Sequence, residues 1–123
     1  MSKILVADDN DASRELIREV LEMSGYEVVE AADGQAALSR ARESAPDLVL
    51  VDIQMPRLDG YGVLRELRAD PGLSGLHVVA LTAFAMQGDR ERALRAGFDG
   101  YIAKPVEIAR LRQEIKKFLS RTP

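Results

Sequence analysis

The sequence predicts an α/β domain with five parallel strands in a doubly wound (βα)5 arrangement. Two observations lead to this expectation. Short apolar runs alternate along the chain with segments whose apolar residues follow the helical period. The central run, Leu48–Val51, has no polar residue, as expected of a strand buried on both faces, and it ends at Asp52. Right-handed crossovers favour the strand order 2-1-3-4-5 with helices on both faces of the sheet.

Three strands and two helices are predicted in the first part of the chain. Asn10–Ser13 can cap a helix whose inward residues we take to be Leu16, Ile17, Val20 and Leu21, and Gly25 ends it. Asp33 can cap a second helix, which carries Ala37, Leu38 and Ala41 inward and ends before Pro46. The strands are Lys3–Ala7, Tyr26–Glu30 and the central run that ends at Asp52.

Three helices and two strands are predicted in the second part. Gly60–Arg68 carries Val63, Leu64 and Leu67 on one side and stops at Asp70–Gly72. Gln87–Ala96 has a thin apolar face, so we expect a loosely held surface helix. The last helix, Glu107–Leu119, is amphipathic through Ile108, Leu111, Ile115 and Phe118. The strands are His77–Leu81, which leads into Thr82, and Asp99–Ala103, which leads into Lys104.

The composition is that of one ordinary globular domain. With 123 residues, 46% hydrophobic and 30% charged, the chain can bury one core, so we expect residues 1–123 to form a single domain with a core at 3–119 and a free tail at 120–123. Its apolar runs are far shorter than the ~20 residues that span a bilayer, and no signal-peptide pattern is present, which favours a cytoplasmic protein without a membrane partner.

Charge and cysteine content exclude several functions. The net charge of -3 argues against non-specific nucleic-acid binding, which needs a basic surface. Because the sequence has no cysteine, it has no disulfide, no thiolate metal site and no thiol nucleophile.

Polar side chains follow four of the predicted strands, at the point where each strand ends. Asp8 and Asp9 follow the first strand, Asp52 the third, Thr82 the fourth and Lys104 the fifth. Because the carboxyl ends of parallel strands share one edge, we expect these groups to meet. Three carboxylates this close repel one another, and a hard divalent cation resolves the conflict, so Mg²⁺ is the expected cofactor.

This set of groups suits phosphoryl transfer to a carboxylate. Asp52 would attack phosphorus, while Lys104 and Thr82 would hold phosphoryl oxygens. The acyl phosphate adds about -1.5 to -2 charge units and three strong acceptors, enough to pull Thr82 and its loop inward.

At these residues the chain resembles a known family. The acid pair in Ala7–Asn10, the loop Asp52–Pro56, Thr82–Ala83 and Lys104–Pro105 resemble, in order and spacing, the receiver domain of two-component response regulators, whose fold is flavodoxin-like (CheY-like). The resemblance runs from Lys3 to about Leu119. The segment Thr82–Met86 further resembles stand-alone receivers of the chemotaxis and cell-cycle kind.

The resemblance implies a role for each matching position. Asp52 would be the phosphoacceptor, Thr82 the switch hydroxyl, Lys104 the phosphate partner and Tyr101 the switch aromatic, with a commonly cis peptide at Lys104–Pro105. The Mg²⁺ ligands would be the side chains of Asp9 and Asp52, the backbone carbonyl of Gln54, and Asp8 mainly through water.

The resemblance also implies partners. A histidine kinase or histidine phosphotransfer protein would supply the phosphoryl group, and a downstream protein would bind the face made by the fourth helix, fifth strand and fifth helix. We expect a monomer or a weak phosphorylation-dependent dimer. The domain would catalyse only its own phosphorylation and dephosphorylation and would not otherwise be an enzyme.

Other interpretations remain open from the residues alone. Asp8–Asn10 could simply cap a helix, Asp52 could be a turn residue, and Lys104 could be a solvated surface charge. Among functions, the alternatives are a receiver excised from a hybrid histidine kinase, a phosphate sink or binding-only adaptor, an aspartyl-phosphate phosphohydrolase and an FMN carrier. The hydrolase would need a second acid where Gln54 stands, and the acids at Asp8–Asp11 would repel the phosphate of FMN.

Two further predictions concern residues outside this constellation. His77, the only histidine, enters its strand at the end opposite the site and is expected to be a surface residue. Phe84 and Met86 follow the switch threonine, and we interpret them as partner contacts.

Overall fold

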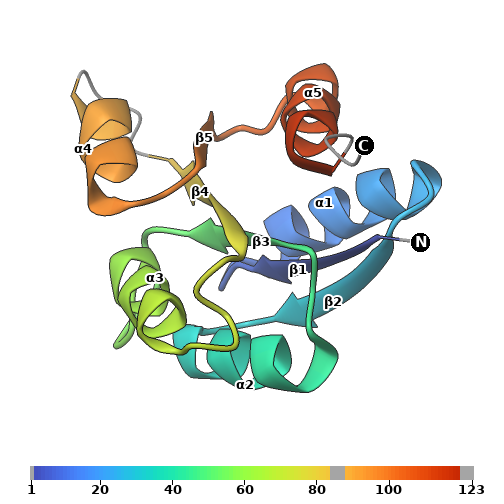
Figure 1. Cartoon of the computed structure of the whole chain (residues 1–123). Helices are drawn as coiled ribbons and strands as arrows, with labels where there is room; N and C mark the ends of the chain where they lie inside the picture. Colours follow the sequence, from blue (N-terminus) through green and yellow to red (C-terminus); the bar gives the residue numbers. More distant parts are fainter. Residues whose placement is uncertain (1, 84–87, 120–123) are drawn as a thin grey trace.

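A computed structural model describes residues 2–83 and 88–119 as five strands alternating with five helices (Figure 1). All neighbouring strands pair in parallel, and their order is β2-β1-β3-β4-β5, which confirms the predicted topology. The strands are β1 (Lys3–Ala7), β2 (Glu27–Ala31), β3 (Leu48–Asp52), β4 (His77–Thr82) and β5 (Gly100–Ala103). The helices are α1 (Asp11–Met23), α2 (Gly34–Ser44), α3 (Gly60–Ala69), α4 (Asp89–Ala96) and α5 (Ile108–Leu119).

The sheet separates two hydrophobic clusters, because successive strand residues point to opposite faces. On one face, strand residues such as Val6 and Leu50 pack with Ile17 of α1 and Ile115 of α5. On the other face, strand residues such as Val51 pack with apolar residues of α2, α3 and α4. Figure 1 shows α1 and α5 together on one side of the sheet and α2 and α3 on the other.

Capping side chains begin the first three helices, and the sequence predicts the first two of these caps. Asn10, Asp33 and Asp59 each accept a hydrogen bond from the backbone N–H three residues ahead, at 2.8 to 2.9 Å. These caps fix where the chain leaves the loops at the carboxyl edge of the sheet, and those loops carry the candidate site.

Some predicted details differ from the structure. β2 is one residue later than the predicted strand Tyr26–Glu30, because the Tyr26 N–H donates to the Leu21 carbonyl and so completes the last turn of α1. Leu16 and Ile108 were expected on inward faces, but they are 45% and 46% exposed. Ile108 is the first residue of α5, and Leu16 borders a groove that Ala83 and Val106 also line.

The structure agrees with the expectation of a thin apolar face for the fourth helix. Ala93 is its one buried residue and Leu94 is 39% exposed. The helix begins at Asp89 after Gly88, whose φ of +93° is the left-handed conformation that glycine adopts readily. The predicted start at Gln87 lies outside the described residues, as do Phe84, Met86 and the tail at 120–123.

Candidate phosphoacceptor and metal site

Register brings the predicted site residues to one edge of the sheet. Ala7 of β1 pairs with Val51 of β3, so Asp8 and Asp52 follow side by side. Asp52 in turn pairs with Leu81, next to Thr82. The last pair of β4 and β5 is Thr82 with Ala103, and Lys104 follows it. The five groups therefore come together from four strands, as the sequence analysis expects.

Buried polar side chains distinguish this edge of the sheet from the rest of the described structure. Among the described residues, the buried polar or charged side chains are Asp8, Asp52 and Thr82, with exposed fractions of 0%, 4% and 1%. Desolvated polar groups lower stability unless they are paired, so a protein seldom gathers them without a use for their chemistry. Their position at one strand edge makes this edge the candidate functional site.

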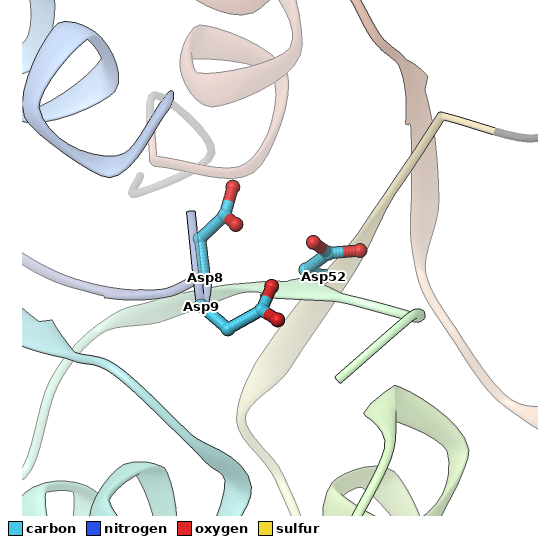
Figure 2. A group of neighbouring side chains, drawn as sticks. All are labelled: Asp8, Asp9 and Asp52. Carbon is cyan, nitrogen blue, oxygen red and sulfur yellow. The ribbon is translucent and has the colours of Figure 1, made fainter. Parts of the chain in front are cut away.

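The three aspartates can share one ion. One carboxylate oxygen from each of Asp8, Asp9 and Asp52 lies within 4.8 Å of the others. Figure 2 shows Asp8 and Asp9 projecting from the end of β1 toward Asp52 at the end of β3. Asp9 is exposed, whereas the other two are buried, so the cluster opens to solvent on the Asp9 side.

Lys104 neutralises part of this charge. Its Nζ lies 2.8 Å from Asp8 Oδ2 and 3.0 Å from Asp52 Oδ2. The remaining oxygens of these two carboxylates accept backbone N–H groups of their own loops, Asn10 to Asp8 and Gln54 to Asp52, each at 2.9 Å. One ammonium thus bridges the two buried carboxylates and holds their orientation.

The pKa directions follow from this pairing. Burial raises the pKa of the Asp52 carboxyl, and the opposing effect of Lys104 and the Gln54 N–H does not cancel it. At Asp8 burial acts in the same direction, but Lys104 and the Asn10 N–H outweigh it and lower the pKa. At Lys104 burial lowers the pKa, while the two carboxylates outweigh burial and raise it.

The donor set fits a divalent cation. Asp8 Oδ2 is buried and accepts no well-aligned hydrogen bond from the described residues, although Lys104 lies close to it. Its partly unused lone pairs, the exposed carboxylate of Asp9 and an oxygen of Asp52 form an all-oxygen set of the kind that Mg²⁺ prefers.

Gly60 allows α3 to approach the end of β3. A Cβ atom at this position would lie 2.7 Å from Ile53 Cα and 2.8 Å from the Asp52 carbonyl oxygen. The Gly60 N–H donates to the Ile53 carbonyl at 3.0 Å, which closes the loop that follows Asp52. The position of Asp52 therefore depends on a glycine eight residues later.

Thr82 and Tyr101 have the surroundings expected of buried strand residues. The Thr82 hydroxyl donates to Gln54 Oε1 at 3.1 Å, a contact that the sequence analysis did not predict. Tyr101 is 8% exposed, and its hydroxyl has no hydrogen-bond partner within the part of the chain that the structure describes. Burial raises the pKa of Tyr101, and nearby Asp89 and Tyr61 add to this effect. The Lys104–Pro105 peptide bond is cis, as the resemblance implies.

Arg14 contributes to the site but was missed in the sequence analysis. Its guanidinium donates to the Asp8 carbonyl oxygen at 2.7 Å, to Asp11 at 2.7 Å and to Glu30 at 3.1 Å. The sequence pattern predicts that an arginine on a helix is a solvated surface charge. The spacing between Asp8 and Arg14 does not predict the contact between them. His77, by contrast, lies at the start of β4, at the opposite edge of the sheet, as expected.

Residues 4–116 match the family model described as the response regulator receiver domain. The chain belongs to the response regulator receiver family. The resemblance noted in the sequence is therefore confirmed, and the fold is that of CheY-like receivers.

The most similar curated receivers include the polar-differentiation response regulator DivK of Brucella anthropi, which is 41% identical over 94% of both chains. Among solved structures, the receiver domain of the Pseudomonas aeruginosa sensor histidine kinase PA1611 is 38% identical, with a TM-score of 0.88 and 97% and 98% coverage, and it holds a magnesium ion in its active-site cleft. The Vibrio cholerae chemotaxis protein CheY4 is 27% identical, with a TM-score of 0.90 and 97% and 99% coverage.

These matches identify the protein as a receiver domain closely related to DivK. A function in a phosphorelay fits this relationship. The alternative of a fragment of a hybrid kinase is not favoured. Within the described residues, none of this receiver's helices is both long and apolar enough to span a bilayer.

Proposed function

We propose that Asp52 accepts a phosphoryl group from a histidine kinase or histidine phosphotransfer protein, and that the resulting acyl phosphate changes which protein the domain binds. The observation that carries the proposal is the contact of Lys104 with both buried carboxylates at 2.8 and 3.0 Å, beside the exposed Asp9. A carboxylate nucleophile, an ammonium and an open acidic cluster are the groups that this transfer requires.

The transfer step balances with the groups present. An oxygen of Asp52 attacks phosphorus in line as the P–N bond of phosphohistidine breaks, and the electron pair of that bond stays on the imidazole nitrogen. Lys104 keeps its proton, since its raised pKa holds it charged, and it interacts with a phosphoryl oxygen as the aspartate charge is used in bonding. Thr82, beside Asp52 in the register, can donate its hydroxyl to another oxygen.

The proposed metal ligands are the side chains of Asp9 and Asp52 and the carbonyl of Gln54, with Asp8 acting mainly through water. When bound, Mg²⁺ would supply positive charge that neutralises the carboxylate and phosphoryl oxygens. Asp8 would then serve chiefly to hold Lys104, which agrees with its complete burial and its lowered pKa.

The donor's docking surface is proposed to be the groove beside Lys104. This groove of about 590 Å³ is bordered by α1, Ala83 and the loop before α5, and it includes Leu16, Lys104 and Val106. Its lining is mainly apolar, and Lys104 connects it directly to Asp52. A helical phosphohistidine protein seated there would cover Leu16, one of the large apolar residues that the fold leaves exposed.

The downstream partner is proposed to bind the face made by α4, β5 and α5. Tyr101 in β5 connects this face to the site, because β5 leads directly into Lys104. The cytoplasmic location and the weak phosphorylation-dependent dimer stay predictions from the sequence.

Phosphoryl incorporation tests the proposal. Wild-type protein mixed with Mg²⁺ and a phosphorylated histidine phosphotransfer protein should become labelled, whereas Asp52→Ala should not. Asp70→Asn, at a loop aspartate at the opposite edge of the sheet, is the matched control and should label like wild type. Equal labelling of Asp52→Ala and wild type would exclude Asp52 as the acceptor.

A further inference from the structure

Gln54 contacts both the proposed phosphoacceptor and the proposed switch residue. Its backbone N–H donates to Asp52 Oδ1 at 2.9 Å, and its side-chain Oε1 accepts the Thr82 hydroxyl at 3.1 Å. Thr82 is 1% exposed, whereas Gln54, in the loop after β3, is an exposed residue. An exposed side chain therefore reaches inward to hold a buried hydroxyl.

A threonine hydroxyl has a single proton, so it donates to one acceptor at a time. While Thr82 donates to Gln54, that proton is not available to an oxygen on Asp52. A phosphoryl group on Asp52 would add strong acceptor oxygens, and a hydrogen bond to a charged oxygen is about twice as strong as one to a neutral amide. The two acceptors compete for the same proton.

We propose that the Gln54 side chain is a brake on switching: it holds the Thr82 hydroxyl in the unphosphorylated state and must release it before Thr82 can engage the phosphoryl group. This inference rests on the proposed function, and it assigns Gln54 a positioning role that is separate from the metal contact of its backbone carbonyl. Breaking the hydrogen bond between Thr82 and Gln54 costs free energy, and this cost raises the free energy of the state in which Thr82 contacts the phosphoryl group.

Removal of the brake should therefore strengthen binding of a phosphoryl mimic. Gln54→Met keeps the length of the side chain but cannot accept this hydrogen bond as an amide does. A neutral intramolecular hydrogen bond contributes about 0.5–1.5 kcal/mol, so loss of this one should raise the affinity for beryllofluoride in the presence of Mg²⁺ by about 2- to 10-fold. A general loss of folding stability would not by itself strengthen binding of beryllofluoride to the folded protein.

The test is calorimetric titration of beryllofluoride into wild type, Gln54→Met and the matched control Gln113→Met, which changes an exposed glutamine on α5. Gln113→Met should bind like wild type. Titration with Mg²⁺ alone should give the same affinity for wild type and Gln54→Met, because the backbone carbonyl at position 54 is unchanged.

A double-mutant cycle tests whether Gln54→Met changes beryllofluoride affinity through the Thr82 hydroxyl. In a Thr82→Val background the hydroxyl is gone, so Gln54→Met should no longer raise beryllofluoride affinity. Affinity of Gln54→Met equal to or below that of wild type, or the same gain with and without the hydroxyl, would overturn the brake while leaving Asp52 as the acceptor. Absence of beryllofluoride binding by wild type itself would instead overturn the proposed function and this inference with it.

Discussion

Lys104 and Asp8 form an ion pair with 2.8 Å between Nζ and Oδ2, at a position where the Asp8 side chain has no exposed surface. The same ammonium donates to Asp52 Oδ2 at 3.0 Å. A single cation therefore partly neutralises two carboxylates that would otherwise be buried next to each other. The stability of the metal-free protein should depend on this lysine.

Lys104→Met should lower the free energy of unfolding of the metal-free protein. The substitution leaves the buried Asp8 carboxylate without its counter-ion, and removal of one partner of a buried ion pair costs about 3–5 kcal/mol. Urea denaturation in EDTA measures the loss. Lys116→Met, at an exposed lysine of α5, should stay within about 0.5 kcal/mol of wild type, and an equal loss in both variants would contradict the special role of Lys104.

Asp9→Asn should raise the thermal stability of the metal-free protein and reduce the stabilisation that Mg²⁺ provides. Asp9 is exposed and belongs to the three-carboxylate cluster, so removal of its charge relieves repulsion and should raise the melting temperature in EDTA. Mg²⁺ at 100 times its dissociation constant should stabilise wild type by about 2.7 kcal/mol, and this gain should be largely lost in the variant. Thermal melts in EDTA and in Mg²⁺ provide the comparison. A variant that gains as much from Mg²⁺ as wild type would show that Asp9 is not a ligand.

The topology was predictable because the inner strands are buried on both faces and the helices on one. Runs such as Leu48–Val51 cannot be placed at a surface, and parallel order then determines which strand ends are neighbours. The convergence of the candidate site residues followed from that single step, since these residues stand at the strand ends.

Contacts between loops were not predictable in the same way. The hydrogen bond from Thr82 to Gln54 depends on how the loop after β3 folds back, which periodicity does not encode. The exposure of Leu16 likewise depends on which neighbouring segments pack against that part of α1. The helical period indicates the direction of a side chain around the helix axis, but it does not indicate which segments cover it.

Tyr101→Phe should stabilise the protein, and more so at high pH. The buried hydroxyl has no hydrogen-bond partner among the described residues, so its removal should be neutral or favourable by up to about 1 kcal/mol at pH 7. Because the folded state raises the pKa of Tyr101 above 10.0, the unfolded chain releases this proton first and wild-type stability falls as pH rises past that value. The phenylalanine variant lacks this loss. Melts at pH 7 and pH 10.5 measure both effects, and a gap between variant and wild type that narrows at the higher pH would contradict the assignment.

Arg14 ties the acidic loop to two other elements. Its guanidinium donates to the carbonyl oxygen of Asp8 at the end of β1, to Asp11 in α1 and to Glu30 in β2, and only 16% of the side chain is exposed. Arg18 also lies near Glu30, at 3.7 Å, but no hydrogen bond joins it to Asp8 among the described contacts. The two arginines therefore share one ion-pair partner and differ in the contact to the acidic loop.

Arg14→Met should weaken Mg²⁺ binding by about 10-fold, as is typical when a group that orients metal ligands is removed. The variant keeps all three carboxylates, so the loss would come from their positions and not from their charge. Arg18→Met is the matched control, because it removes a positive charge from the same helix and the same Glu30 pair while leaving the Asp8 carbonyl contact intact. Calorimetric titration of Mg²⁺ into both variants separates the two effects. Loss of a positive charge near the acidic cluster would by itself strengthen Mg²⁺ binding, so Arg18→Met should bind Mg²⁺ at least as tightly as wild type. Weakening in Arg14→Met alone would assign the effect to the backbone of Asp8, where β1 delivers its acid pair to the site, whereas equal weakening in both variants would contradict this assignment.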